Sequence, residues 1–367
     1  MLRKKNSIFA PSNLTKMENH SINQCDKVLL IYTGGTIGMG QNPTTGALQP
    51  LDFEHLESQV QEFQYLKTDV DIYQFDPPID SSDMSPECWS KLVQIISENY
   101  DKYAGFVILH GTDTMAYTAS ALSFMLENLT KPVILTGSQL PVGQLRTDGK
   151  ENLITSVQLA AARNADGTPC VPEVCIYFSG KLLRGNRSTK QNAEGFNAFG
   201  SFNYPSLCEA GINFAWNRHY ILKPDFSKPM LPHRDMKAGI VVLSMFPGID
   251  EHNVRHVLNS PDLHSIVMRT YGSGNVPQFP WLIKLLRETT ERGVTIVNIS
   301  QCVTGFVEMS RYSNGYQLKE TGVLSGYDST VEAAVAKLMF LHAKYDDIDT
   351  VRRLMNESLV GEISIPY

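Results

Sequence analysis

Two short stretches, Thr33-Gly34-Gly35-Thr36-Ile37-Gly38 and His110-Gly111-Thr112-Asp113-Thr114, decide the fold of this chain. Each follows a short apolar run rich in β-branched residues, at 27–32 and at 105–109. Runs of this kind form buried strands of a parallel sheet. Ligands of such sheets bind beyond the carboxyl ends of the strands. The two stretches therefore predict turns that present hydroxyl and carboxylate groups at a ligand site.

The residue types in these turns favour acyl transfer. A glycine lets backbone N–H groups approach a ligand, and a hydroxyl beside them can attack a carbonyl while those amides receive the oxyanion. Thr36 and Thr112 are the candidate hydroxyls, and Asp113 adds a carboxylate. A threonine hydroxyl needs a base at neutral pH, for which Lys190 is the candidate. The alternatives are a turn-supporting threonine, a helix N-cap and a surface lysine.

A third polar segment, Asp80-Ser81-Ser82-Asp83-Met84, follows another strand-like run. One interpretation is an Asx-turn with no further role. The other is an amino-acid site, because a serine hydroxyl and backbone amides can bind an α-carboxylate while carboxylates bind the α-ammonium group. The residues alone leave both interpretations open.

The composition excludes several classes of protein. With 367 residues, of which 42% are hydrophobic and 19% charged, the chain is long enough for two domains that each bury a core. The net charge of −6 argues against a nucleic-acid-binding protein, which would carry a basic surface. No apolar stretch approaches the ~20 residues of a membrane helix, and residues 1–26 lack the apolar core of a secretory signal. We expect a cytoplasmic protein that acts on a small molecule, with no nucleic-acid or membrane partner.

The six cysteines show no C-x-x-C pair and no zinc-like spacing with the nine histidines. We therefore expect reduced thiols, no metal site and no cofactor.

Strand-like and helix-like segments alternate along the chain, which predicts an α/β fold with a mainly parallel sheet. Further strand-like runs occupy residues 133–136, 174–178, 240–245, 266–269 and 294–299, and helix-like segments occupy 85–100, 114–127, 150–163, 276–292 and 330–345. Residues 215–235 contain Pro224, Pro229 and Pro232 and no sustained apolar period, as in a linker. We expect a flexible tail at 1–26, a larger N-terminal domain at 27–214 whose sheet is flanked by helices, a linker at 215–236 and a smaller C-terminal α/β domain at 237–367.

Taken together, these motifs resemble those of the bacterial type I L-asparaginases, the cytoplasmic branch of the asparaginase and glutaminase family. The two threonine turns correspond to the two signatures of that family and occur in order with the lysine segment. The matching segments are residues 32–39, 80–84, 107–126, 131–139, 148–149, 184–190 and 269–275.

The resemblance implies an activity, the hydrolysis of L-asparagine to L-aspartate and ammonia, and a role for each matching residue. Thr36 corresponds to the nucleophile that forms an acyl-enzyme, and Thr112, Asp113 and Lys190 correspond to a second set that handles protons. Asp80, Ser81 and Asp113 correspond to positions that hold the α-groups of the substrate, and the amide of Thr112 to an oxyanion donor.

Four more positions are assigned only by the resemblance. Asn275 corresponds to an asparagine that reaches the active site of a neighbouring subunit, which implies a homodimer, usually doubled to a tetramer. Its alternative is an asparagine in a left-handed (αL) turn within Gly272-Ser273-Gly274-Asn275. Thr189, Arg269 and Cys302 correspond to a separate, allosteric asparagine site of some cytoplasmic members. The alternatives are a buried structural arginine for Arg269 and a small core residue for Cys302.

The chain departs from the family in the segment that follows the nucleophile. Many members carry a tyrosine there, whereas this chain reads Thr44-Thr45-Gly46-Ala47-Leu48-Gln49-Pro50. Gly38, Gly40 and Gly46 still favour a mobile lid.

Three other functions remain open. The first is a glutaminase of the same fold. Glutamine has one methylene more than asparagine, and a binding pocket discriminates against one methylene by only ~1 to 3 kcal/mol. A catalytically silent asparagine sensor is the second. The third, a subunit of a transfer-RNA amidotransferase, requires an added N-terminal domain.

Overall fold

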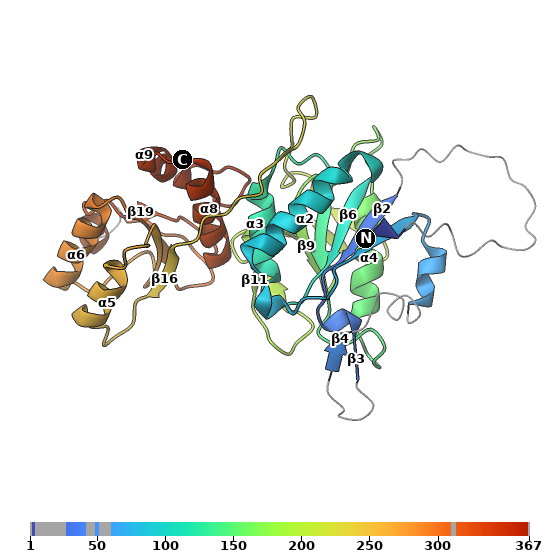
Figure 1. Cartoon of the computed structure of the whole chain (residues 1–367), viewed down its shortest axis with the longest axis horizontal. Coiled ribbons are helices and arrows are strands. Elements are labelled where there is room, and N and C mark those ends of the chain that lie inside the picture. Colours follow the sequence, from blue (N-terminus) through green and yellow to red (C-terminus); the bar gives the residue numbers. More distant parts are fainter. Residues whose placement is uncertain (1, 4–26, 42–47, 51–59, 310–312, 366–367) are drawn as a thin grey trace, which may run out of the picture.

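The structure is a computed structural model, and it describes residues 2–3, 27–41, 48–50, 60–309 and 313–365 (Figure 1). Two expectations lie mostly outside the described residues: the flexible tail at 1–26, except for residues 2 and 3, and the lid segment at 44–47. Figure 1 shows two units side by side, a larger one formed by the N-terminal part of the chain and a smaller one formed by the C-terminal part.

A nine-stranded sheet forms the centre of the larger unit, in the order β1-β5-β2-β6-β8-β9-β10-β13-β14. Strands β5, β2, β6, β8 and β9 run parallel, whereas β1, β10, β13 and β14 pair antiparallel at the two ends. The bounds are Leu2–Arg3 (β1), Val28–Tyr32 (β2), Val70–Gln74 (β5), Gly105–Leu109 (β6), Val133–Thr136 (β8), Val174–Phe178 (β9), Lys181–Arg184 (β10), Cys208–Ala210 (β13) and Phe214–Trp216 (β14). The expectation of a mainly parallel sheet is confirmed, and the carboxyl ends of β2, β6 and β8 lie at one edge.

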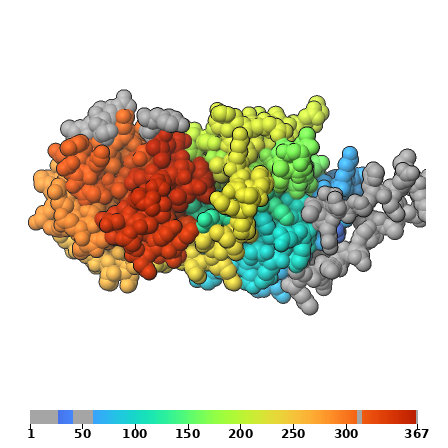
Figure 2. Space-filling model, turned by 90° about the horizontal axis from the view of Figure 1, so that it is seen from above, coloured from blue at the N-terminus to red at the C-terminus, as the bar shows by residue number. Residues whose placement is uncertain are grey.

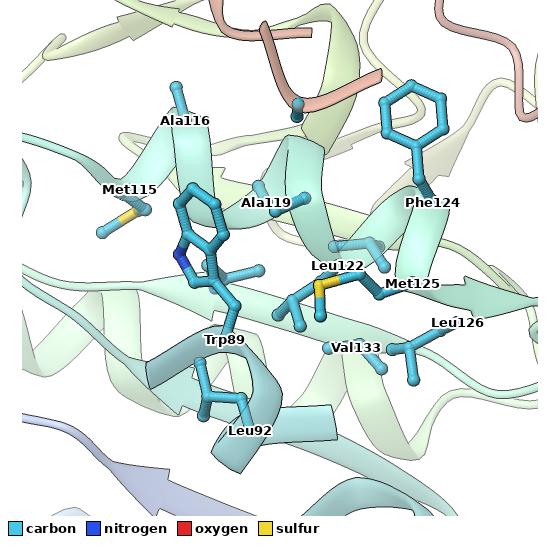
Figure 3. Close-up of a cluster of buried hydrophobic side chains, with 14 of the residues drawn as sticks. Trp89, Leu92, Met115, Ala116, Ala119, Leu122, Phe124, Met125, Leu126 and Val133 are labelled. Carbon is cyan, nitrogen blue, oxygen red and sulfur yellow. The ribbon is translucent and has the colours of Figure 1, made fainter. Parts of the chain in front are cut away.

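Helices cover both faces of this sheet, because alternate residues of the buried strands point to opposite sides. Leu29 and Ile31 of β2 pack in the cluster that contains α2 (Pro86–Glu98) and α3 (Met115–Met125). Their neighbours in β2 pack in the cluster that contains α4 (Gly149–Ala161). Figure 3 shows Trp89 of α2 reaching toward Ala119 of α3, and the Trp89 indole donates a hydrogen bond to Thr118 Oγ1 at 2.9 Å.

The smaller unit is built on a four-stranded parallel sheet in the order β16-β17-β18-β19. One face packs against α5 and α6 and the other against α8 and α9, so the expected smaller α/β unit is confirmed. The bounds are Ile240–Ser244 (β16), Glu251–Leu258 (α5), Ser265–Thr270 (β17), Pro280–Glu291 (α6), Thr295–Ser300 (β18), Ser313–Lys319 (α7), Leu324–Ser325 (β19), Val331–Lys344 (α8) and Ile348–Met355 (α9).

The two units share part of one core, which differs from the expectation of a separate core for each domain. Helix α8 packs against α3, and the Phe124 and Phe340 rings stack with their centroids 6.0 Å apart. Val267 and Val297 of the smaller sheet belong to the same apolar cluster as Leu29 and Ile31 of the larger one. Figure 2 shows the C-terminal part of the smaller unit, in red, lying against the larger unit. The two units are therefore joined by buried side chains as well as by the chain that links them.

The connection between the units is tied to the larger one. Strand β15 (Leu231–Pro232) pairs with β7 (Leu126–Glu127), and β14 crosses the expected boundary at residue 214. The pairing of β7 also explains why α3 stops at Met125 rather than at residue 127. Two small hairpins complete the larger unit: β3 (Met39–Gln41) with β4 (Leu48–Pro50), and β11 (Thr189–Lys190) with β12 (Phe199–Gly200).

Among the residues that the structure describes, no helix combines the length and the apolar character needed to cross a membrane.

Candidate active site

Three loops meet at the edge of the larger sheet, and glycine permits their contact. A Cβ on Gly35 would stand 2.5 Å from the Gly111 nitrogen, and a Cβ on Gly111 would stand 2.5 Å from Ser81 Oγ. Gly35 also has a φ of +91°, which favours glycine. Side chains at these two positions would force apart the segments that carry Thr36, Ser81 and Thr112. We call residues 33–38, 79–83 and 110–114 the loop cluster.

Hydrogen bonds fix the loops to each other. The Thr33 hydroxyl donates to the Leu109 carbonyl at 2.8 Å, and the Ile79 amide donates to the Thr33 carbonyl at 2.7 Å. The Thr114 hydroxyl donates to the Ser81 carbonyl at 2.6 Å. The three segments therefore form one rigid support, as a site of fixed geometry requires.

Thr36 is half-buried and begins a short 3-10 turn, Thr36–Gly38, directly after Gly35. Thr112 directly follows Gly111, so the Gly35–Gly111 contact brings the two threonine-bearing segments together. Ile37 anchors the first segment, since its side chain is buried and its carbonyl accepts from the Val142 amide at 3.1 Å.

The structure joins the other three candidate catalytic residues by hydrogen bonds. Lys190 Nζ donates to Thr112 Oγ1 at 2.8 Å and to Asp113 Oδ1 at 2.6 Å. The Thr112 side chain is buried, Lys190 is 18% exposed and Asp113 is 65% exposed. Hydroxyl, amine and carboxylate thus form a chain from the interior to solvent. Such a chain can pass a proton between a bound reactant and bulk water.

The Asp80–Met84 segment supplies one buried hydroxyl and one capping carboxylate. Ser81 is buried against Gly111. Asp80 is exposed, and its Oδ1 accepts from the amide and the hydroxyl of Ser82, both at 2.9 Å, at the start of the 3-10 turn Ser81–Asp83. That oxygen therefore makes the Asx-turn considered from the sequence, while the Ser81 side chain faces Gly111 inside the loop cluster.

Two residues near the site carried no role in the sequence analysis. Gln139 Oε1 accepts from Thr112 Oγ1 at 3.4 Å, and Gln139 Nε2 donates to the Gly195 carbonyl at 3.1 Å. The Asp148 carboxylate accepts from the amides of Gln139 and Leu140 at 3.0 to 3.2 Å. The position of Gln139 in the sequence could have indicated its place near the site, because it follows β8, whose carboxyl end lies at the same sheet edge as those of β2 and β6.

His110 is the other support that the sequence did not reveal. Its ring is buried, with Nδ1 2.6 Å from the Gly111 carbonyl and Nε2 2.9 Å from Thr118 Oγ1. Burial lowers the pKa of His110 to about 4. The ring is therefore neutral at neutral pH and orients the Gly111 peptide that precedes Thr112.

Asn275 belongs to the smaller unit rather than to the loop cluster. It lies in the turn after β17, where it exchanges backbone hydrogen bonds of 2.8 and 3.0 Å with Tyr271. Asn275 does not have a positive φ, so the left-handed turn is wrong for this residue, and its reach to a neighbouring subunit stays a prediction.

Thr189, Arg269 and Cys302 line one cavity of about 90 Å³ where the two units meet, here called the junction cavity. Its wall also contains Glu332, which accepts a hydrogen bond from Thr189 at 2.6 Å. Cys302 is exposed, so the core alternative for this residue is wrong.

Within the described ranges, no group of three or more His, Cys, Asp or Glu side chains is arranged to hold a metal ion.

Comparisons with known proteins identify the family. The profile of the asparaginase N-terminal domain matches residues 27–221, and that of the glutaminase/asparaginase C-terminal domain matches residues 239–355. L-asparaginase 1 of Escherichia coli (strain K12) is 42% identical over 346 residues, covering 93% of this chain and 99% of that protein.

Solved structures agree with the sequence comparison. L-asparaginase I from Vibrio cholerae O1 biovar eltor str. N16961 is 41% identical, with a TM-score of 0.83 over 93% of this chain and 100% of that one. The thermostable L-asparaginase from Thermococcus kodakarensis has a TM-score of 0.83 at 31% identity, with the same two coverages. The chain therefore belongs to the asparaginase family.

Proposed function

We propose that this protein hydrolyses L-asparagine to L-aspartate and ammonia, with Thr36 as the nucleophile. The observation that carries the proposal is the pair of hydrogen bonds from Lys190 to Thr112 and Asp113, beside the glycine contact that brings in Thr36. The two relatives that are named L-asparaginases and are more than 40% identical support the same substrate.

The reaction has two steps: an ester forms between Thr36 and the side-chain acyl group of the substrate, and water then hydrolyses it. Thr36 Oγ1 attacks the side-chain carbonyl carbon of asparagine, the C–N bond breaks, and the hydroxyl proton leaves with the nitrogen as ammonia. The N–H of Thr112 receives the oxyanion, at the start of the turn that leads into α3. Water then attacks the ester, a proton returns to Thr36, and aspartate is released. Thr112, Asp113 and Lys190 carry these protons between the reacting atoms and solvent.

The α-groups of the substrate have candidate partners in the same loop cluster. Ser81 offers a buried hydroxyl for the α-carboxylate. Asp113 is 65% exposed, so its carboxylate is open to an α-ammonium group as well as to Lys190. Asp80 stands next to Ser81 as a second carboxylate. Asn275 would reach this site from a neighbouring subunit, so we include a homodimer or homotetramer in the proposal; light scattering of the purified protein tests it.

Ammonia release from L-asparagine and from L-glutamine, with wild-type protein and the Thr36→Ala variant, tests the function. We expect asparagine to be preferred and Thr36→Ala to lose about 10⁴-fold or more in kcat. Thr168→Ala is the matched control and should leave the rate unchanged, since the Thr168 hydroxyl bonds Asn164 and Asp166 of its own turn.

Other outcomes identify the rival functions. A higher kcat/KM for glutamine would replace the substrate and keep the mechanism. Saturable asparagine binding without ammonia release above the Thr36→Ala background would replace the enzyme with a sensor.

We also propose that the junction cavity binds a second asparagine molecule and regulates the enzyme. Arg269 offers a guanidinium group for a carboxylate at this cavity, with Thr189 and Cys302 in its wall. A sigmoidal dependence of rate on asparagine that becomes hyperbolic in Arg269→Met supports regulation. A hyperbolic curve for the wild type contradicts it.

The proposed compartment is the cytoplasm. Cys88, Cys170, Cys175, Cys208 and Cys302, the cysteines among the described residues, are free thiols, which supports a reducing environment. Cell fractionation tests this assignment.

A further inference from the structure

Glu332 of the smaller unit contacts the residue that precedes the candidate catalytic lysine. It lies in the first turn of α8, and its Oε1 accepts a hydrogen bond from Thr189 Oγ1 at 2.6 Å. Thr189 and Lys190 are the two residues of β11, and Lys190 Nζ bonds Thr112 and Asp113. The side chains of Thr189 and Lys190, which are consecutive in the sequence, thus connect α8 to the loop cluster.

The geometry of a strand explains how this connection works. Successive side chains of a strand point to opposite sides, so Thr189 faces the junction cavity while Lys190 faces the loop cluster. Strand β11 is only two residues long, and among the described strands its one partner is the equally short β12. A strand this short takes little of its position from a sheet, so a side-chain bond at Thr189 has a large share in setting the direction of Lys190.

Glu332 is a buried carboxyl group whose position is set by its neighbours. Its side chain is buried, and its Oε1 accepts the Thr189 hydrogen bond. Burial raises the pKa of Glu332, while hydrogen bonds from Thr189, from its own amide and from Thr330, and the charge of Arg269, act in the opposite direction. Hydrogen bonds of this kind compensate a carboxyl group for its removal from water.

The charged and titratable groups around Glu332 come from several elements. The charge of Arg269 of β17 lowers the pKa of Glu332, and Tyr117 of α3 feels the charges of both Glu332 and Arg269. Arg187 and Asp328 form a buried ion pair, at 2.6 Å, in the wall of the same cavity. The Glu332–Thr189 bond therefore forms in a polar junction to which both units contribute.

We propose that Glu332 is a positioning residue: by holding Thr189 it fixes β11, and through β11 it keeps Lys190 Nζ on Thr112 and Asp113. The inference rests on the proposed function, in which Lys190 belongs to the catalytic set. Glu332 also lines the junction cavity.

Steady-state kinetics of Glu332→Ala, Glu332→Gln, Thr189→Val and the double variant Glu332→Ala/Thr189→Val test the proposal. We expect Glu332→Ala and Thr189→Val each to lower kcat about tenfold, with a smaller change in KM, because a misplaced proton-transfer group slows chemistry more than binding. The amide oxygen of Glu332→Gln can still accept from Thr189, so this variant should keep most of kcat. The double variant should be no slower than either single variant.

Lys337→Met is the structural control on the same helix. Lys337 is buried and forms an ion pair with Glu362 at 2.6 Å, so its loss should destabilise the protein while the folded enzyme keeps its kcat. If Lys337→Met lowers kcat as much as Glu332→Ala, or if the Glu332 and Thr189 effects multiply, the positioning role is overturned.

Crystal structures of the wild type and of Glu332→Ala give a readout that does not depend on turnover. We expect the Lys190 Nζ to Thr112 Oγ1 distance to increase from 2.8 Å to beyond hydrogen-bonding range in the variant. An unchanged Lys190 contradicts the inference even if the wild type hydrolyses asparagine. A displaced Lys190 supports it even if the wild type proves to be a sensor.

Discussion

The loop cluster and the junction cavity are both polar sites, but they are assembled in different ways. In the loop cluster, backbone meets backbone at Gly35 and Gly111, and neutral hydrogen bonds join the segments. At the junction, buried charged side chains meet across long sequence separations: Arg187 pairs with Asp328 at 2.6 Å, and Glu332 bonds Thr189.

Because of this difference, the two sites are sensitive to different kinds of substitution. A site made by close backbone approach fails when atoms are added, because neighbouring backbone cannot move aside. A site made by buried charges fails when one partner is removed, because the other charge is left unpaired. Three predictions follow this contrast, from the largest expected effect to the smallest.

Gly35→Ala should be the most damaging change. The new Cβ would meet the Gly111 nitrogen at 2.5 Å, and φ is +91°. Backbone strain and overpacking each cost about 1 to 3 kcal/mol, so we expect a loss of about 4 kcal/mol in stability and of nearly all activity. Urea unfolding and ammonia release measure the two losses.

Gly167→Ala is its control. Gly167 also has a positive φ, +83°, but a Cβ there has no atom within 4 Å. This variant should lose about 1 kcal/mol and keep its activity. If Gly35→Ala and Gly167→Ala lost equal stability and activity, the positive φ alone, and not the close contact with Gly111, would explain why position 35 needs glycine.

Arg187→Met should destabilise the junction by about 3 kcal/mol. Breaking a buried ion pair costs about 3 to 5 kcal/mol, and the lower end applies because Asp328 also accepts the Ser364 amide at 2.7 Å. Arg353→Met, which removes an exposed pair with Glu357, should cost less than about 0.5 kcal/mol. Similar unfolding midpoints for these two variants would contradict the importance of burial at the junction.

Acid should weaken the loop cluster through His110. Burial lowers its pKa in the folded state to about 4, against an ordinary value of 6.5. The unfolded chain therefore binds the proton first as the pH falls, and stability decreases between pH 6.5 and 4. The expected contribution of this one group is about 2 kcal/mol between pH 7 and pH 5.

The His110→Asn variant isolates this contribution. Its unfolding free energy should be lower at pH 7 but fall by about 2 kcal/mol less between pH 7 and pH 5. His342→Asn gives a second case in the smaller unit, because burial also lowers the pKa of His342 to about 4. An unchanged pH dependence in His110→Asn would mean that the buried ring is not the source of the acid sensitivity.

The regular elements were predictable where the apolar pattern was long or the strand fully buried. The expected strands at 105–109, 133–136 and 174–178 coincide with β6, β8 and β9. Helices α5 and α9 were missed, because each is eight residues long and buries only two side chains. The capping carboxylates of Asp250 and Asp347 were the available signal.

The antiparallel end of the large sheet was not predicted either. Strands β13 and β14 have three residues each and pair through registers such as Glu209 with Ala215. Segments this short carry almost no periodicity, so their pairing depends on the sheet edge that β10 offers.

The sequence by itself determined the α/β class, the mainly parallel character of the larger sheet and the loops that carry Thr36, Ser81, Thr112 and Asp113. These features depend on local properties: apolar runs form buried strands, and glycines next to hydroxyls mark turns at the strand ends. The tertiary structure alone decided that Lys190 reaches Thr112, that α8 shares a core with α3, and that Glu332 holds Thr189. Those contacts join residues up to 143 positions apart, and their geometry depends on how whole elements pack, which no local pattern encodes.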